Sequence, residues 1–280
     1  MIAVVYSGSK NACWKIWQEG TAMIETHTAS VNPCFNDHKQ LLQVLSKNIT
    51  LIHNAENIRK IYVFAAGASA KEKQQELTST LEQFFVNGKI KVKDDVYGAA
   101  IAACHDKTGI VGILGSGANC AYYNGKKPEK NNYGLGYILA DEGSANYFGK
   151  MLLKNFLEGK MPEDLKMKIE AQYNLDRPGI LERVYRKPQA QTYLASFLDF
   201  YVDNRDHTYI QQLLAQGFDK YIQSYIIPTL EKHPEEEIHF VGSVAGAFQD
   251  QLREVASKYN INIVSVTKEP IHNILNYYTN

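Results

Sequence analysis

The sequence predicts a mixed α/β fold, and three observations support this prediction. Short apolar runs alternate with turn residues at the N-terminus, and segments with helical spacing then alternate with further apolar runs. A strand that ends in Ser-Gly occurs twice, at Ser7-Gly8 and at Ser116-Gly117, 109 residues apart. The chain of 280 residues has room for one large domain or two modest ones. The recurring motif leaves an internal duplication open.

The first half predicts a β-hairpin front followed by alternating helices and strands. Residues 2–6 form an apolar run, 7–11 are turn residues, and 12–17 predict the returning strand. A third strand is expected at 22–28, and Asn36 or Asp37 can cap a helix that continues to Asn48. The remaining expected elements are a strand at 60–65, a helix at about 70–85, an alternating strand at 89–93 and a small-residue helix at 96–104.

The second half repeats this theme with a long helical region inside it. Residues 109–114 predict a strand, 115–119 a turn and 120–123 a returning strand. A helical region is expected from about 144 to 232, interrupted near Pro162, Pro178 and Pro188. The remaining expected elements are a strand at 237–241, a helix at 245–258, a strand at 261–266 and a last helix at about 270–278.

Composition excludes several classes of protein. The 30 basic and 30 acidic residues cancel, so neither a nucleic acid nor an anionic membrane is an expected partner. No apolar run reaches the ~18 residues of a membrane-spanning helix, and the N-terminus lacks the pattern of a signal peptide, so a cytoplasmic location is expected. The 4 cysteines have no CxxC spacing and the 8 histidines form no HxxxH or HxH array. We therefore expect no disulfide framework, no structural zinc and no histidine metal site, and these patterns name no metal-ligating residue.

Glycine and serine turns and carboxylates are the candidate chemical groups. A Gly/Ser turn after a strand presents backbone N–H groups that can bind phosphate, although such a turn is also an ordinary hairpin. Asp94-Asp95, at a strand end, can supply a general base or can cap the next helix. Asp141 and Glu142 lie between glycines before Ser144 and can hold a sugar hydroxyl or a hydrated metal ion, or can serve as capping residues.

Taken in order, these segments resemble the N-acetylglucosamine kinase group of the BadF/BadG/BcrA/BcrD-type ATPases, within the sugar kinase, Hsp70 and actin superfamily. The resemblance covers nearly the whole chain. Asp95 and the small residues after it resemble the catalytic aspartate and its helix. The other matching segments are 109–120 (GIVGILGSGANC, similar to the GI..ILGTGSNC phosphate loop), 134–144 (GLGYILADEGS, similar to GxG..LGDEGS), 31–33 (VNP, the sugar-contacting segment) and 241–245 (VGSVA, the adenosine loop).

The resemblance implies an α/β fold of two ribonuclease-H-like lobes, the actin-like ATPase fold, with nucleotide and sugar in the cleft between the lobes. It implies an N-terminal lobe at 1–107 and a C-terminal lobe with a helical insertion at 108–280. The last helix, at about 270–280, can pack back on the first lobe. Relatives are often dimers, so a homodimer is one open alternative.

The implied reaction is phosphoryl transfer from ATP, with Mg²⁺, to the hydroxymethyl oxygen of an amino sugar. Asp95 then accepts the proton of the sugar hydroxyl. The implied sugar contacts are Asn32, Asn119 and Asp141. The implied ATP contacts are Ser7, Gly8, Ser9, Gly115, Ser116, Gly117, Gly242 and Ser243.

The chain departs from the family pattern in the first phosphate loop. Tyr6 stands where the family has the acid that orients hydrated Mg²⁺, and a neutral phenol cannot replace that charge. Ala118 and Ala140 also replace a serine and a glycine of the pattern. Two functions stay open at this point: an amino-sugar kinase, and a catalytically impaired relative that binds a sugar or nucleotide and reports on it. An ATPase of the dehydratase-activator kind is disfavoured, because the cysteines do not suit an iron–sulfur cluster.

Overall fold

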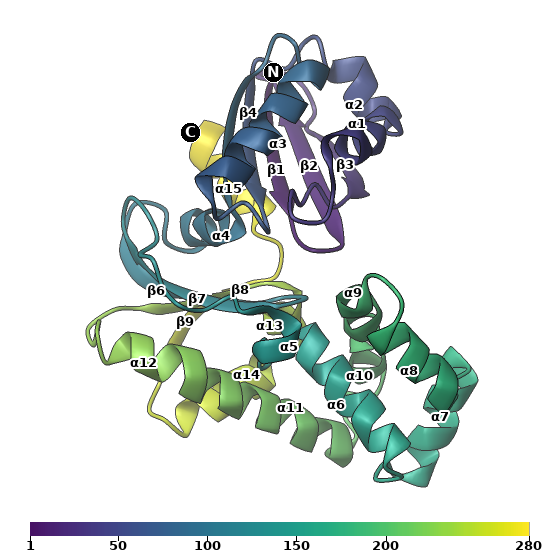
Figure 1. Cartoon of the computed structure of the whole chain (residues 1–280). Helices are drawn as coiled ribbons and strands as arrows, with labels where there is room; N and C mark the ends of the chain where they lie inside the picture. The colour runs from purple at the N-terminus through teal and green to yellow at the C-terminus, as the bar shows by residue number, and fades with distance from the viewer. Residues whose placement is uncertain (280) are drawn as a thin grey trace. The chain divides into compact units, whose positions relative to one another are not determined.

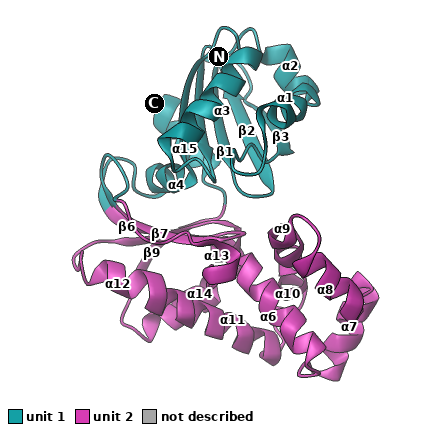
Figure 2. Cartoon of the chain, viewed as in Figure 1, with its two compact units in different colours: residues 1–108, 123–129, 269–280 teal, residues 109–122, 130–268 magenta. Residues whose placement is uncertain are grey.

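Strands of the chain form two separate sheets in the computed structural model, which describes residues 1–279 (Figure 1). The chain divides into two compact units, coloured separately in Figure 2. Unit 1 contains residues 1–108, 123–129 and those described from 269 onward, whereas unit 2 contains residues 109–122 and 130–268. The mixed α/β class predicted from the sequence is confirmed.

The sheet of unit 1 has five strands in the order β3-β2-β1-β4-β5. Their bounds are β1 Ile2–Ser7, β2 Asn11–Trp17, β3 Ile24–Ala29, β4 Lys60–Ala65 and β5 Lys89–Asp94. Strands β1, β2 and β3 form an antiparallel meander, whereas β1, β4 and β5 run parallel. The register places Ser7, Ala65 and Asp94 in one row, so these three parallel strands end together at one edge.

Helices cover both faces of this sheet. Their bounds are α1 His38–Ser46, α2 Ile49–Asn54, α3 Lys71–Phe84, α4 Asp95–Cys104 and α15 Ile271–Thr279. Leu45 of α1 and Leu77 of α3 are buried in one core cluster with Trp14 of β2. On the opposite face, Val4 and Phe64 are buried with side chains of α4 and α15. The last helix therefore belongs to the core of the N-terminal sheet.

The sheet of unit 2 has the order β7-β6-β8-β9. Its strands are β6 Thr108–Leu114, β7 Ala118–Asn124, β8 Ile238–Val241 and β9 Ile263–Thr267. Strands β6, β8 and β9 run parallel, with Ile113, Val241 and Thr267 in one row. Strands β1 and β6 hold equivalent positions, each between the other strand of its hairpin and a parallel strand. The two Ser-Gly motifs therefore follow topologically equivalent strands.

The helical region of unit 2 breaks at the prolines, as predicted. Pro162 is the N-cap of α7 and Pro178 lies in the first turn of α8. Pro188 precedes α9. The helices are α5 Gly136–Leu139, α6 Ala145–Leu157, α7 Glu163–Tyr173, α8 Arg177–Tyr185, α9 Ala190–Ala195, α10 Leu198–Asp203, α11 Thr208–Tyr221, the π-helix η1 Ile222–Ile226, α12 Ile227–Leu230, α13 Ser243–Ala247 and α14 Gln249–Ser257.

One predicted helix is shorter in the structure and another is divided. The helix expected to continue to Asn48 ends at Ser46, because the Asn48 side chain caps α2 by accepting the backbone N–H of Leu51. The helix expected from 245 to 258 is interrupted at Phe248, whose backbone leaves the helical region. Among the described residues, no helix is both long and apolar enough to cross a membrane.

Candidate functional site

The carboxyl edge of the unit 1 sheet gathers most of the site residues predicted in the first half of the sequence. Ser7 ends β1, and Asp95 directly follows β5 in the neighbouring row. Asn32 lies beside Gly67, which follows β4. Open α/β sheets bind ligands at the carboxyl ends of their parallel strands, so the topology places these residues where a ligand is expected.

The two adjacent aspartates have separate roles at the start of α4. The side chain of Asp94 accepts the backbone N–H of Tyr97 at 2.8 Å and is the N-cap of the helix. Asp95 is the first helical residue, so its carboxylate is not needed as the cap. A Cβ at Gly98 would lie 2.7 Å from the Cβ of Phe64. The glycine therefore lets α4 pack closely on the sheet and fixes the position of Asp95.

Burial and a neighbouring charge alter the acidity of this group. Desolvation, followed by the charge of Asp94, raises the pKa of the Asp95 carboxyl to about 7, against the lowering effect of nearby backbone N–H groups. Burial also raises the pKa of the Tyr6 phenol well above 10, with further contributions from Asp95 and Asp94. Asp95 is therefore half ionised near neutral pH, whereas Tyr6 is uncharged.

The first Ser-Gly turn is joined to the segment that carries Asn32. The buried Ser7 hydroxyl lies 3.2 Å from the Ser30 hydroxyl and accepts the backbone N–H of Val31 at 3.1 Å. The Ser30 hydroxyl donates to the carbonyl oxygen of Gly8 at 2.6 Å. Ser7 thus ties the turn to the rest of unit 1, while a Cβ at Gly8 would meet nothing within 4 Å. The free space at this turn therefore lies beside Gly8.

Asn32 is buried and held by local hydrogen bonds. Its Oδ1 accepts the backbone N–H of Cys34 at 2.8 Å, and the side chain is only 3% exposed. Gly67 has a φ of +80°, and a Cβ at this position would lie 2.1 Å from Oδ1 of Asn32. A glycine is required here by the backbone conformation and by the close approach of the asparagine.

The second Ser-Gly turn, at residues 115–117, lies against the N-terminus of α6. The backbone N–H of Ala145 donates to the carbonyl oxygen of Gly115 at 2.9 Å, and that of Asn146 donates to Ser116 at 3.0 Å. A carbonyl and the following N–H of one trans peptide point in opposite directions, so the N–H groups of Ser116 and Gly117 are directed away from the helix. In the described part of the chain, no protein group hydrogen-bonds to the Ser116 hydroxyl or to the Gly117 N–H. These are free donors for an anion.

The Asp141 side chain hydrogen-bonds to residues next to this turn. Its Oδ1 accepts the backbone N–H of Ala118 at 2.9 Å and its Oδ2 accepts from Nδ2 of Asn146 at 3.2 Å. A Cβ at Gly117 would lie 3.0 Å from Oδ1 of Asp141. Asp141 as a residue is 5% exposed, and this burial raises the pKa of its carboxyl against the lowering effect of the two hydrogen bonds. Asp141 therefore links the residue after this turn to the first turn of α6.

Gly242 and Ser243 follow β8 at the same carboxyl edge as the second turn. Gly242 has a φ of +125°, and a Cβ there would lie 2.3 Å from the carbonyl oxygen of Leu114. The glycine therefore allows this segment to border the 115–117 turn. Ser243 begins α13.

Two tyrosines that were not predicted as site residues hydrogen-bond to Asn119 and to the segment 141–142. Tyr221 donates to the carbonyl oxygen of Asn119 at 2.7 Å, and the Asn119 side chain accepts the N–H of Cys120 at 2.8 Å. The Tyr225 hydroxyl donates to Glu142 at 3.0 Å and accepts the N–H of Asp141 at 3.3 Å. Tyr221 is the last residue of α11, and Tyr225 lies in the π-helix η1 that follows. Their four-residue spacing is visible in the sequence, but such spacing is typical of core residues and does not indicate a site.

Comparison with known proteins identifies the family. A scan against protein-family models and a search of curated proteins each gave no match. Among solved structures, the putative N-acetylglucosamine kinase of Porphyromonas gingivalis superimposes with a TM-score of 0.92 at 32% sequence identity, covering 99% of this chain and 98% of that one. The chain belongs to this N-acetylglucosamine kinase-like family.

More distant members of the fold confirm the architecture predicted from the sequence. The putative N-acetylglucosamine kinase of Chromobacterium violaceum has a TM-score of 0.72 at 16% identity and covers 99% of this chain and 98% of its own. A ROK family glucokinase from Streptomyces griseus, solved with glucose and AMPPNP, has a TM-score of 0.59 at 11% identity, with 98% of each chain covered. The chain therefore has the fold shared by sugar kinases and actin-like ATPases.

Proposed function

We propose that this protein is an ATP-dependent kinase of an amino sugar, with N-acetylglucosamine as the expected substrate type. Membership of the family at 32% identity over nearly the whole of both chains supports this proposal. The observation that carries it is Asp95, a carboxylate at the carboxyl edge of a sheet with a pKa of about 7. A general base is most effective when its pKa lies near the working pH.

In the proposed reaction, Asp95 accepts the proton of the sugar hydroxymethyl group. The oxygen attacks the terminal phosphorus of ATP, the bond to the bridging oxygen breaks, and ADP leaves. Asn32, Asn119 and Asp141 keep the sugar-contacting role implied by the resemblance. The position of Asp141 beneath the second turn adds a positioning role, since its carboxylate holds the backbone N–H of Ala118.

The nucleotide side of the proposal uses backbone donors. The N–H groups of Ser116 and Gly117 point outward and, with the Ser116 hydroxyl, can donate to phosphate oxygens. These donors are uncharged, so binding through them removes no protein charge from water. Gly115 contributes space, since a Cβ there would meet nothing within 4 Å. In this proposal Gly242 and Ser243 border the adenosine. The first turn contributes further phosphate contacts through Gly8 and Ser9, because the Ser7 hydroxyl, also implied as an ATP contact, is buried and bonded to Ser30 and Val31.

Magnesium fits the oxygen donors at the edge of unit 1. Asp94 lies in the same row as Ser7 across β1, β4 and β5, and Asp95 follows it, so two carboxylates lie at the edge that carries the first turn. Mg²⁺ is typically held by one or two carboxylates together with waters and substrate phosphates. Bound there, Mg²⁺ would neutralise charge on the phosphates, while the uncharged Tyr6 adds none.

Tyr6 favours one alternative function, a sugar-binding protein with impaired catalysis. Its phenol stays neutral at every physiological pH because burial and the two aspartates raise its pKa well above 10. An acid at this position would orient the hydrated metal, whereas the phenol cannot. In this alternative, binding of the sugar persists and turnover is lost.

The test is ADP release by purified protein with MgATP and a panel of hexoses and N-acetylhexosamines. A kinase releases ADP in a sugar-dependent manner, with the highest kcat/KM for N-acetylglucosamine or a close analogue. The sugar product should carry phosphate on its hydroxymethyl oxygen, as phosphorus NMR can determine. Sugar binding by calorimetry without turnover of any sugar would replace the kinase proposal with the binding protein.

A substitution at position 6 separates the two outcomes further. If the missing acid limits metal binding, Tyr6→Asp raises the Mg²⁺-dependent affinity for ATP, whereas Tyr6→Phe leaves it unchanged. Equal ATP affinities of Tyr6→Asp and Tyr6→Phe, measured with and without Mg²⁺, would remove metal orientation as the consequence of this residue.

A further inference from the structure

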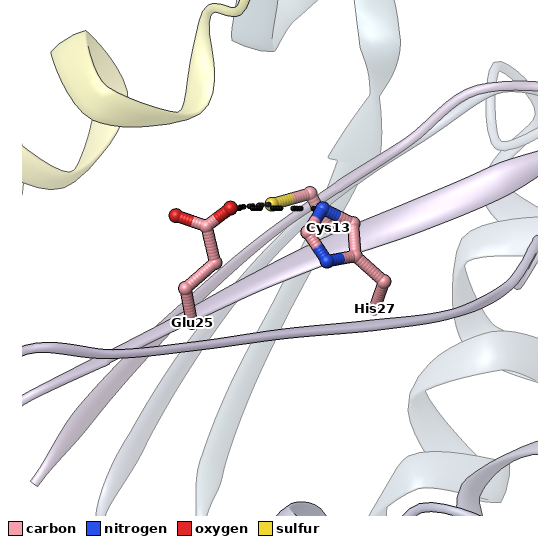
Figure 3. Close-up of side chains that lie close together, drawn as sticks. All are labelled: Cys13, Glu25 and His27. Atoms are coloured by element: carbon pink, nitrogen blue, oxygen red, sulfur yellow. Dashed lines mark hydrogen bonds and ion pairs between the residues drawn. The ribbon is translucent and has the colours of Figure 1, made fainter.

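Four polar side chains gather on one face of the β2–β3 hairpin. Cys13 of β2 is directly opposite His27 of β3, and Lys15 is directly opposite Glu25. Side chains alternate across a sheet, so residues two apart share a face with their cross-strand partners. Figure 3 shows the cysteine, the glutamate and the histidine converging from the two strands. Glu25 and His27 are exposed and Cys13 is half-buried, which leaves the three possible ligands accessible.

The ligand atoms have the separations that a small tetrahedral ion requires. The Sγ of Cys13 lies 3.9 Å from Oε1 of Glu25, and Nε2 of His27 lies 3.6 Å from the same oxygen. All three ligand atoms lie within 4.8 Å of one another. Zinc bonds of ~2.0–2.3 Å at tetrahedral angles place neighbouring ligand atoms about 3.3–3.5 Å apart. Small side-chain movements close the remaining gap.

The buried Lys15 side chain fixes the orientation of the Glu25 carboxylate. Lys15 is 0% exposed, and its Nζ lies 2.5 Å from Oε2 of Glu25 and 3.0 Å from Nε2 of His272 on α15. This pairing uses Oε2 and leaves Oε1 turned toward Cys13 and His27. Hydrogen bonds to the second atom of a ligating group are a common means of fixing metal ligands. Glu25 and His27 are 38% and 62% exposed, so a hydrated ion can reach them and retain a water.

We propose that Cys13, Glu25 and His27 form a binding site for one divalent transition-metal ion of the zinc type. A thiolate, an imidazole and a carboxylate together favour Zn²⁺ over Mg²⁺ or Ca²⁺, which prefer oxygen ligands only. The fourth position is open for water. On binding, the S–H bond of Cys13 breaks, its proton goes to solvent, and the sulfur forms the bond to the metal.

Metal binding at this position would cross-link β3 to β2. Through Glu25, Lys15 and His272, it would also stabilise the contact between the sheet and α15. The site lies wholly within unit 1 and does not depend on the proposed kinase activity. The absence of CxxC and HxxxH patterns does not exclude it, because its ligands come together by strand pairing.

The direct test is a Zn²⁺ titration of the metal-stripped full chain in competition with a chromogenic chelator. We expect one ion per chain for the natural sequence. His27→Gln and Cys13→Ser should each weaken binding by at least the ~10–100-fold seen when even an outer-shell partner is lost. Co²⁺ supplies a second readout, because a thiolate ligand gives a sulfur-to-cobalt charge-transfer band that Cys13→Ser should abolish and Cys34→Ser should retain.

Matched controls distinguish this site from adventitious binding. His53→Gln removes another exposed histidine of unit 1, and Cys34→Ser removes an exposed cysteine. Both should bind Zn²⁺ as the natural sequence does. The ring of His27 is mostly in solvent, so His27→Gln tests the site without disturbing the core. Absence of stoichiometric binding, or binding unaffected by His27→Gln or by Cys13→Ser, would overturn the proposal.

Discussion

Replacing Asp95 by asparagine should strongly reduce activity and at the same time stabilise the protein. The carboxylate is held where burial and Asp94 disfavour its charge, which raises its pKa to about 7. Asparagine has nearly the same shape as the protonated acid but carries no charge at any pH. It cannot accept the proton of a substrate hydroxyl, so kcat should fall by ~10²–10⁴-fold, the usual contribution of general base catalysis.

The size of the stability change follows from the two pKa values. Between pH about 4 and about 7, Asp95 is ionised in the unfolded chain but protonated in the folded one. The folded state then binds more protons, so the free energy of unfolding falls as pH rises and levels off above pH 7. The gap between the ordinary value of 3.8 and about 7, at ~1.36 kcal/mol per pH unit, sets an upper limit of about 4 kcal/mol.

Urea unfolding of both proteins at pH 4 and pH 8 measures this difference. We expect equal free energies of unfolding at pH 4 and a more stable Asp95→Asn variant at pH 8, by about 2–4 kcal/mol. Asp94→Asn is the matched control. It retains a capping oxygen for Tyr97 and removes a charge next to Asp95. Burial raises the pKa of Asp94 as well, so this variant should also be more stable at pH 8, although by less than Asp95→Asn, and the acid limb of its kcat/KM profile should move to lower pH.

Two outcomes would refute this reasoning. An Asp95→Asn variant that is no more stable than the natural sequence at pH 8 would show that the ionised Asp95 carboxylate does not destabilise the folded state. Retention of full sugar-dependent ADP release would show that another group accepts the proton.

Two further predictions concern the second turn. Gly242→Ala places a Cβ 2.3 Å from the Leu114 carbonyl at a φ of +125°, so it should lower the free energy of unfolding by ~1–3 kcal/mol or more in urea titrations, whereas Gly115→Ala, with open space around it, should not. Asp141→Ala leaves the donors of Ala118 and Asn146 buried without an acceptor. It should cost about 1–3 kcal/mol per group by the same measurement and weaken ATP binding in a thermal-shift titration, whereas Asp141→Asn, which keeps one acceptor oxygen, should lose less.

Local chemistry explains why much of the fold could be predicted from the sequence. The apolar runs that became β1, β2, β4 and β6 are bounded by glycine, serine or asparagine, and the prolines at 162 and 178 mark helix starts. These signals act over a few residues and need no partner. The separate helix α2 after Asn48 and the break at Phe248 were missed, because continuous helical spacing hides a cap or a single non-helical residue.

The roles of individual site residues were decided only by the tertiary structure. The sequence placed Asp94 and Asp95 at a strand end, but only the start of α4 determines that Asp94, and not Asp95, is the cap. Likewise, Asp141 was recognisable as a candidate, yet its bond to Ala118 depends on chain segments that fold back on each other.

The sequence by itself determined the order of strands and helices, the two Ser-Gly turns and the family. The strand register, which no spacing rule predicts, decided which side chains of neighbouring strands lie together. Cys13 and His27 are 14 residues apart in the chain and become neighbours only because β2 pairs with β3 in one register. A shift by one residue would place them on opposite faces, since side chains alternate along a strand.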